Sequence, residues 1–267
     1  MPYLELCRTV VADIKAELER LPTRNERELV LGRGKGGDET TQIDFAAEQA
    51  VVRRLETLDV PGLTLVSEEL GEKVFGTGGP LRVVLDPIDG SINAKRGIPF
   101  FSVSIAFADG DTMADVFFGY VYDFGSGEEW LARRGEGAWL DGEPLGAERP
   151  KDEIELLSFE ATETALIAER APSVVGLAKR LRIMGSLALS LCHLAAGRVD
   201  AVCSLKPARS IDVAAAQLLV REVGLAIEFV DGVEPFISSA LDLESRSRIA
   251  AAGTDELCRR LSDRLRT

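Results

Sequence analysis

The sequence predicts a protein of mixed α and β structure, with an α+β first half and an α/β second half. Three observations lead to this class. Apolar residues recur at helical spacing near the N-terminus. Between residues 63 and 133, short β-branched and aromatic runs are separated by Gly, Asp and Pro, and after residue 150 strand-like and helix-like segments alternate. With 267 residues, the chain is long enough for one large domain or two smaller ones.

Two helices are predicted first, over residues 3–21 and 44–58, because apolar residues recur on one side of each. A Gly-rich loop, GRGKGGDETTQ, begins at Gly32 and lies between them. The runs that follow are short and strongly apolar, as in a mostly antiparallel sheet. Their sequences are LTLVS, LRVVLD, FFSVSIAFA, ADVFFGYVYD and EEWLARR.

The polar segment GAERPKDE, residues 146–153, predicts a domain boundary that divides the chain into residues 1–150 and 151–267. Beyond it the pattern predicts an α/β domain. Its expected elements are a strand at IELLSFE, helices over 162–170, 173–181, 186–196 and 211–222, strands over 199–205, 225–230 and 248–252, and a last helix over 254–265 with Thr254 as N-cap.

Composition excludes several classes of function. A net charge of −13 argues against binding nucleic acid through a basic surface. The chain has no apolar run of 18 residues and no signal-peptide pattern, so we expect a cytoplasmic protein that does not enter a membrane. None of the four cysteines is in a CxxC pair, which favours reduced, buried thiols. The single histidine, His193, excludes a zinc site of several histidines.

The most informative stretch is VVLDPIDGSINAKRGIPFFSVSIA, residues 83–106. Taken alone, DPIDGS is a turn. Because it ends a strong apolar strand, however, Asp86 and Asp89 can converge on one point. Gly90 and Ser91 can open a short helix that ends near Gly97, and its first amides could hold an anion. A cation and a phosphate oxygen would meet at this corner.

Further acids follow strands or open helices. Glu68 and Glu69 follow LTLVS, and Asp44 and Asp212 each begin a predicted helix. Each has an ordinary interpretation, as a solvated acidic pair or an N-cap. Together they resemble a site of oxygen ligands for Mg²⁺.

Other motifs fit less well. The acids do not have the spacing of an EF-hand or of a D-x-D phosphatase. Gly32, Gly34 and Gly37 match G-x-G-x-x-G, but the next helix opens several residues late, so a flexible loop that carries Lys35 is favoured over a dinucleotide site.

At this point the sequence resembles the inositol monophosphatase-like family of Mg²⁺-dependent phosphatases, which includes fructose-1,6-bisphosphatases and bisphosphate nucleotidases. The matching pieces are VSEELGE, LDPIDGSIN with GIPFFSVSIA, GEGAWLDGEPL and SIDVAAAQLLVREVG, in the family's order over residues 30–230. The short length of the chain and its GIPFF segment are most similar to the archaeal-type branch of this family. The resemblance implies a layered αβαβα sandwich of the fructose-1,6-bisphosphatase type, a homodimer, and fructose-1,6-bisphosphate or inositol-1-phosphate, or both, as substrates.

The resemblance also implies roles for individual residues. One Mg²⁺ would be bound by Glu68, Asp86 and the Ile88 carbonyl, and a second by Asp86, Asp89 and Asp212. A third, weaker ion would lie near Glu68 and the loop with Lys35, whose side chain would bind the substrate as a counter-charge. The Gly90 and Ser91 amides would hold the phosphate next to Asp89. The catalytic residues implied are Glu68 together with Asp44 and Ser91, where Asp44 pairs with the Ser91 hydroxyl and helps to deprotonate the attacking water.

Two departures concern selectivity. Inositol-selective relatives have Trp before the last metal-binding Asp and an acid seven residues before it, whereas this chain has Ile211 and Leu205. Strict inositol selectivity is therefore not expected. Positive side chains stand nearby instead, and Arg209 is the residue expected to bind a second phosphate. Lys206 also brings positive charge there, whereas Arg180 and Arg182 either approach the same pocket or are solvated surface residues. A nucleotide 3′-phosphatase and a non-catalytic scaffold of the same fold remain the alternatives.

Overall fold

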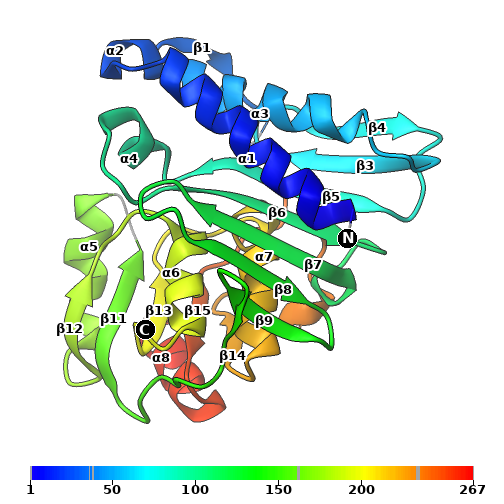
Figure 1. The fold of residues 1–267 in the computed structure, drawn as a ribbon. Coiled ribbons are helices and arrows are strands. Elements are labelled where there is room, and N and C mark those ends of the chain that lie inside the picture. Colours follow the sequence, from blue (N-terminus) through cyan, green and yellow to red (C-terminus); the bar gives the residue numbers. More distant parts are fainter. Residues whose placement is uncertain (1, 36, 38, 161–162, 233–234, 267) are drawn as a thin grey trace.

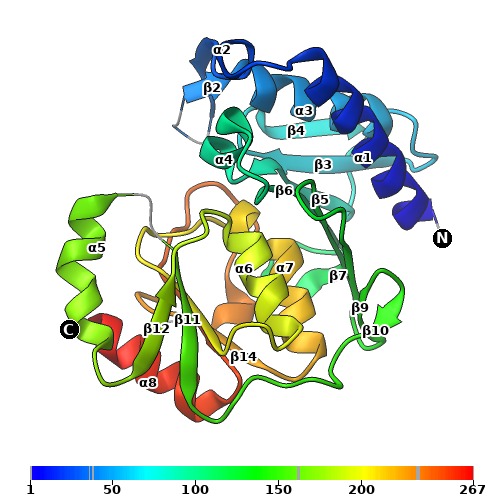
Figure 2. The same ribbon diagram turned by 60° about the vertical axis from the view of Figure 1, so that its left-hand side comes forward.

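The computed structural model describes residues 2–35, 37, 39–160, 163–232 and 235–266, which fold into five stacked layers (Figures 1 and 2). Helices α1 and α3 cover one face of an eight-stranded sheet. Helices α6 and α7 fill the space between the other face and a five-stranded sheet, and α5 and α8 cover the far side of that second sheet. The bounds of the helices are α1 Pro2–Arg20, α2 Arg24–Arg27, α3 Gln42–Leu55, α4 Ser91–Arg96, α5 Thr164–Arg170, α6 Leu187–Ala195, α7 Ser210–Glu222 and α8 Asp255–Arg266.

The eight-stranded sheet has the order β10-β9-β8-β7-β6-β5-β3-β4. Its pairs are antiparallel except for β3 and β5, which run parallel. The strands are β3 Gly62–Ser67, β4 Gly71–Gly76, β5 Arg82–Asp89, β6 Ser102–Ala108, β7 Val116–Asp123, β8 Glu129–Arg133, β9 Gly137–Leu140 and β10 Glu143–Pro144. The mostly antiparallel sheet predicted for this part of the chain is confirmed.

The five-stranded sheet has the order β12-β11-β13-β15-β14, with β12, β11 and β13 parallel and the other pairs antiparallel. Its strands are β11 Ile154–Glu160, β12 Ala178–Arg182, β13 Ala201–Ser204, β14 Ala226–Phe229 and β15 Ile249–Ala252. Strands and helices alternate along this half, as predicted. A separate ribbon of β1 (Val30–Arg33) and β2 (Glu39–Thr41) lies beside α3.

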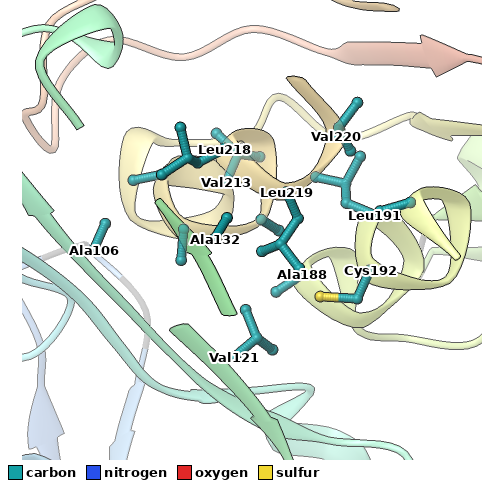
Figure 3. Close-up of a cluster of buried hydrophobic side chains, with 14 of the residues drawn as sticks. Ala106, Val121, Ala132, Ala188, Leu191, Cys192, Val213, Leu218, Leu219 and Val220 are labelled. Carbon is teal, nitrogen blue, oxygen red and sulfur yellow. The ribbon is translucent and has the colours of Figure 1, made fainter. Parts of the chain in front are cut away.

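Strand periodicity divides the interior into three cores, because successive side chains point to opposite faces of a sheet. In β5, Val83 and Leu85 pack under α1 and α3, whereas Val84 faces the central layer. In β13, Val202 faces the central layer and Cys203 faces α8. Figure 3 shows the central core, in which side chains of α6 and α7 meet small residues of the eight-stranded sheet.

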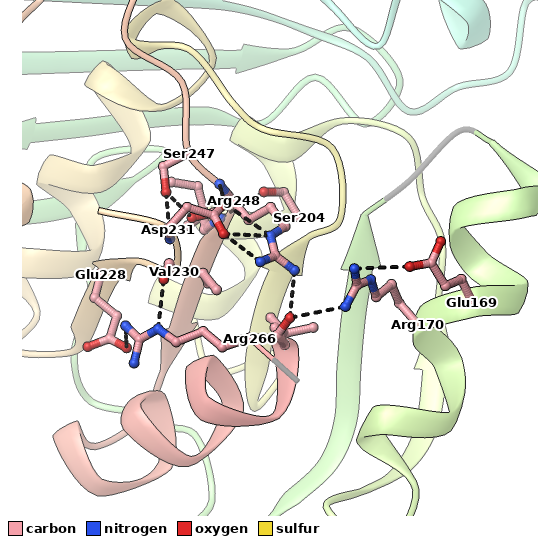
Figure 4. A network of polar contacts seen from close by, with 11 residues as sticks. Glu169, Arg170, Ser204, Glu228, Val230, Asp231, Ser247, Arg248 and Arg266 are labelled. Carbon is pink, nitrogen blue, oxygen red and sulfur yellow. Dashed lines mark hydrogen bonds and ion pairs between the residues drawn. The ribbon is translucent and has the colours of Figure 1, made fainter. Parts of the chain in front are cut away.

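The C-terminal helix is fixed by arginines at its end (Figure 4). Arg248 donates from Nη1 to the Leu265 carbonyl (2.6 Å) and also pairs with Asp231. Arg170 donates to the same carbonyl from α5 (3.5 Å). Cations at the C-terminus of a helix satisfy its free carbonyls and offset its dipole. At the other end, Thr254 Oγ1 accepts from the Leu257 amide (3.2 Å), which confirms the predicted N-cap.

The helix predicted over 173–181 is wrong. Residues Ala171–Val174 form a 3₁₀ turn, and the chain then reverses at Gly176, which has φ +77°. Residues 178–182 form the edge strand β12, paired in parallel with β11. A left-handed glycine and the free edge of β11 thus outweigh the helical pattern. Part of the helix predicted over 162–170 is present as α5, but Thr162 lies outside the described residues.

The segment where a domain boundary was predicted joins the two sheets, since β10 ends at Pro144 and β11 begins at Ile154. The two halves nevertheless share the central core, to which α7 contributes against β5, β6, β7 and β8. No helix in the described part of the chain combines the length and apolar character needed to cross a bilayer.

The contact between α7 and β7 generates a prediction about stability. A Cβ added at Gly119 would lie 2.5 Å from the Ala215 carbonyl oxygen, so helix and strand pack closer than any side chain allows. We expect Gly119→Ala to lower the free energy of unfolding in urea by about 1–3 kcal/mol. The control is Gly32→Ala, because a Cβ there meets nothing within 4 Å. Equal stability of the two variants would contradict this account of the packing.

Candidate active site

A cavity of about 600 Å³ opens where both halves of the chain meet. It is rich in carboxylates and is bordered by the starts of several helices. Its lining residues are Glu39, Asp44, Glu68, Glu69, Asp86, Ile88, Asp89, Gly90, Ser91, Ile92, Asn93, Lys95, Ile183, Met184, Gly185, Lys206, Arg209 and Asp212. The predicted metal ligands Glu68, Asp86, Ile88, Asp89 and Asp212 are all among them.

The parallel pair in the first sheet brings Glu68 beside Asp86. Strands β3 and β5 run in the same direction, with Ser67 opposite Leu85 in the register. Glu68 follows Ser67, and Asp86 follows Leu85, so the two acids leave the same edge of the sheet. This adjacency of carboxyl ends could not be read from the sequence, which gave no strand order.

A bulge brings Asp89 to the same side as Asp86. Residues three apart on a regular strand point to opposite faces. Here Asp86 lies opposite Ser104 and Asp89 opposite Ser102, so β5 holds one extra residue between the two pairs. Pro87 stands in this interval, where its missing N–H breaks no ladder bond. The Asp86 carboxylate also accepts the Ile88 amide (3.0 Å), which stiffens the bulge.

Four helices begin at the wall of the cavity. Asp44 and Asp212 are third residues of α3 and α7, and the Asp212 carboxylate accepts the amide of Arg209 (2.6 Å). At the start of α6, Asp89 accepts the Ser186 hydroxyl (2.5 Å) and the Ala188 amide (2.8 Å). The positive ends of these helices offset part of the carboxylate charge.

The fourth helix, α4, begins at Gly90 and ends at Gly97, as predicted. Gly90 has φ +91°, and a Cβ there would lie 3.1 Å from the carbonyl oxygens of Gly185 and Phe100. The turn therefore requires glycine on both counts. Asn93 fixes α4 by donating to the Phe100 (2.7 Å) and Met184 (2.8 Å) carbonyls.

Burial of these acids changes their protonation. Burial raises the pKa of Glu68 to about 7, against the opposing effect of the Arg209 cation. Burial likewise raises the pKa of Asp89 to about 7, partly offset by the hydrogen bond from Ser186. The pKa of Asp86 lies well above its ordinary value because of burial and the nearby charges of Glu68, Asp89 and Asp212. Without a bound cation, these acids therefore hold their protons to a higher pH than ordinary carboxyl groups do.

The donor set fits a hard divalent cation. It offers carboxylate oxygens and a backbone carbonyl and no thiolate or imidazole, as Mg²⁺ prefers. In the described part of the chain no three acidic, His or Cys side chains are already arranged around one point, however. The guanidinium of Arg209 lies between two of the acids, where it donates to Glu68 (2.6 Å) and Asp212 (3.2 Å).

Several predicted contacts differ in the structure. The Ser91 hydroxyl donates to the Ile88 carbonyl (2.9 Å) and not to Asp44. Lys35 is exposed outside the cavity lining, where its amide donates to the Glu69 carbonyl (3.2 Å), and Gly36 lies outside the described residues. Arg182 is an exposed residue of β12 whose guanidinium donates to the Leu181 carbonyl, and Arg180 pairs with Glu155 on the surface (2.9 Å).

Sequence reasoning missed three charged residues of the site. Lys95 lines the cavity, with Nζ 3.5 Å from Asp44 Oδ2, and its position one turn after Ser91 could have indicated it. Glu160 accepts the Gly185 amide (2.8 Å) and the Ser190 hydroxyl (2.8 Å), and so fixes the segment beside Asp89. Glu48, one turn after Asp44, is buried behind Glu69 and accepts the Leu70 amide (3.2 Å).

Comparison with known proteins shows the family to which this chain belongs. The model of the inositol monophosphatase family matches residues 4–265. The chain belongs to the inositol monophosphatase family. A fructose-1,6-bisphosphatase/inositol-1-monophosphatase of Archaeoglobus fulgidus is 34% identical over 252 residues, which are 93% of this chain and 92% of that protein. The Nus factor SuhB of Pasteurella multocida is 33% identical over 233 residues, 85% of each chain.

The fold agrees with this membership. A crystal structure of an inositol monophosphatase-fructose 1,6 bisphosphatase superposes with a TM-score of 0.84 at 27% identity and covers 99% of this chain and all of that one. The predicted layered αβαβα sandwich is confirmed, and so is the prediction that the chain is a phosphatase. The family is generally metal-dependent, which agrees with the oxygen-rich donor set.

The raised pKa values give a pH dependence for the metal-free protein. Glu68 and Asp89 bind protons more tightly when folded than when unfolded, so the free energy of unfolding falls as pH rises through 7. In EDTA, we expect the melting temperature to be at least about 2 °C higher at pH 6.5 than at pH 8.

Asp89→Asn is the matched variant, because it removes one of the titrating groups and should reduce this difference. The pKa of His193 is lowered by burial, so it titrates below this window, and the buried thiols titrate above it. A melting temperature that rises towards pH 8 in the unsubstituted protein would contradict the raised pKa values.

Proposed function

We propose that this phosphatase hydrolyses fructose-1,6-bisphosphate and inositol-1-phosphate with two or three Mg²⁺ ions held by Glu68, Asp86, the Ile88 carbonyl, Asp89 and Asp212. The observation that carries the proposal is the gathering of these donors in one cavity beside the Gly90–Ser91 turn. The names of the archaeal relatives support the two substrates.

Bound divalent cations would neutralise the phosphoryl oxygens and lower the pKa of the attacking water. The chain's own residues supply the contacts to the phosphate and the acceptor of the water's proton. The first amides of α4, at Gly90 and Ser91, point a partial positive charge at the phosphate. Asp44 is the proposed acceptor of the water's proton, since its Oδ1 is buried and has no hydrogen-bond partner in the described structure. Lys95 offsets the charge on its other oxygen.

The absence of strict inositol selectivity also forms part of the proposal. Leu205 and Ile211 are buried under the site and do not line it, so neither offers a polar contact to a ring of hydroxyl groups. The lining does include Lys206 and Arg209, whose charge suits a second phosphate. A cytoplasmic location is supported by four free, buried cysteines. The homodimer implied by the resemblance stays a prediction, to be decided by sedimentation.

Phosphate release tests the proposal. With Mg²⁺, we expect hydrolysis of both substrates, with kcat/KM for fructose-1,6-bisphosphate at least equal to that for inositol-1-phosphate, and no hydrolysis in EDTA. A panel that adds a nucleotide 3′-phosphate separates the nucleotidase alternative. No release from any of these substrates with Mg²⁺ would favour the non-catalytic scaffold.

Substitution of one metal ligand should abolish the activity. We expect Asp89→Asn to lower kcat/KM by at least about 100-fold, since the carboxylate charge at the phosphate is lost while the shape of the side chain is kept. Asp109→Asn is the control, because Asp109 is an exposed residue paired with Arg134. A rate for Asp89→Asn within a few-fold of that control, at saturating Mg²⁺, would remove Asp89 from the metal site.

A further inference from the structure

The guanidinium of Arg209 lies within the carboxylate cluster and not at its edge. Its Nη2 donates to Glu68 Oε1 (2.6 Å) and to Asp212 Oδ1 (3.2 Å), and only 8% of the side chain is exposed. Glu68 follows β3, whereas Asp212 belongs to the first turn of α7. One buried cation thus joins acids from the two halves of the chain.

The oxygens that it contacts belong to two of the proposed metal ligands, Glu68 and Asp212. Asp212 Oδ2 is engaged by the backbone amide of Arg209 (2.6 Å), a bond that belongs to the start of α7 and does not depend on the guanidinium. The oxygen left for a metal is Oδ1, to which the guanidinium donates. Glu68 Oε1 is engaged by the same nitrogen.

Electrostatics explains why a cation should be there without metal. Glu68, Asp86, Asp89 and Asp212 line one buried cavity, and buried carboxylates without partners are strongly destabilising. Arg209 supplies a positive charge through Nη2, which donates to one oxygen of each acid. A lysine would supply the same charge on a side chain that is one bond shorter.

We propose that Arg209 is a resident counter-ion of the metal-free site, which a divalent cation displaces from Glu68 and Asp212. The inference rests on the proposed function in taking these carboxylates as metal ligands. Mg²⁺ requires oxygen ligands at about 2.0–2.1 Å in octahedral geometry. A guanidinium on the same oxygens would occupy those positions and repel the ion through a medium of low dielectric constant.

The structure provides a place for the displaced side chain. A second cavity, of about 180 Å³, adjoins the first, and Arg209 lines both. Glu160 lines the second cavity and offers a carboxylate, and Lys206 borders it as well. The guanidinium can therefore turn without crossing the packed core. Metal loading would release its charge towards the substrate, so the metal and a doubly phosphorylated substrate should favour each other's binding.

Calorimetric titration of the EDTA-treated, dialysed full chain with Mg²⁺, and with Mn²⁺ as a second probe, tests the displacement. We expect Arg209→Gln to bind metal about tenfold more tightly than the unsubstituted protein, the factor that corresponds to one charge-assisted hydrogen bond. Arg209→Lys keeps the charge, but its side chain is one bond shorter and does not reach both acids, so it should also bind more tightly. Lys73→Gln removes a charge from an exposed residue of β4 outside the cavity lining and should change the affinity by less than about twofold.

The pattern across the variants separates displacement from a general field effect. If Arg209→Lys binds metal as the unsubstituted protein does, or if Lys73→Gln matches Arg209→Gln, only the net charge matters and the inference is overturned. Weaker binding by Arg209→Gln would also overturn it. Failure of every protein to bind metal would overturn the metal site of the proposed function, and the inference with it.

Thermal denaturation supplies a second readout. The metal-free form of Arg209→Gln should melt at a lower temperature than the metal-free unsubstituted protein, because its acids have lost their counter-ion. Saturating Mg²⁺ should then raise the melting temperature of Arg209→Gln by more than it raises that of the unsubstituted protein. Equal metal-induced rises in the two proteins would contradict the displacement. If Arg209→Gln does not fold without metal, Arg209→Lys carries the same comparison.

Discussion

The structure depends on keeping the carboxylates of Glu68, Asp86, Asp89 and Asp212 together in a buried cavity. Such a group costs free energy, because each charge loses water and repels the others. The chain offsets this cost with helix N-termini, with hydroxyl and amide donors, and with the guanidinium of Arg209. The raised pKa values of the acids show that the compensation is incomplete without further positive charge.

The fold serves this constraint through a few local exceptions to regular structure. A single parallel pair in an otherwise antiparallel sheet places Glu68 next to Asp86. A one-residue bulge at Pro87 turns Asp89 to the same side. Because α7 lies between the two sheets and packs on the first, its N-terminus carries Asp212 from the second half of the chain to acids of the first half. The shared central core therefore determines the geometry of the site.

Much of this could be predicted from the sequence, because side-chain periodicity reports which faces are buried. The acids at strand ends and helix starts indicated the cavity, and the DPIDGS stretch indicated the turn and the helix that ends at Gly97. The predictions that failed concern residues whose position depends on tertiary contacts. A left-handed Gly176 and a free sheet edge made a strand of 178–182, and the folded position of Glu160 could not be inferred without strand order.

Anomalous scattering from crystals grown with Mn²⁺ tests the central claim most directly, since it locates the ion without relying on turnover. The account predicts a peak in the cavity within coordination distance of Asp86, with Glu68, Asp89 or Asp212 as further ligands, and a guanidinium of Arg209 that has left Glu68. Metal bound only elsewhere on the chain, with Arg209 still on Glu68 and Asp212 at saturating Mn²⁺, would contradict it.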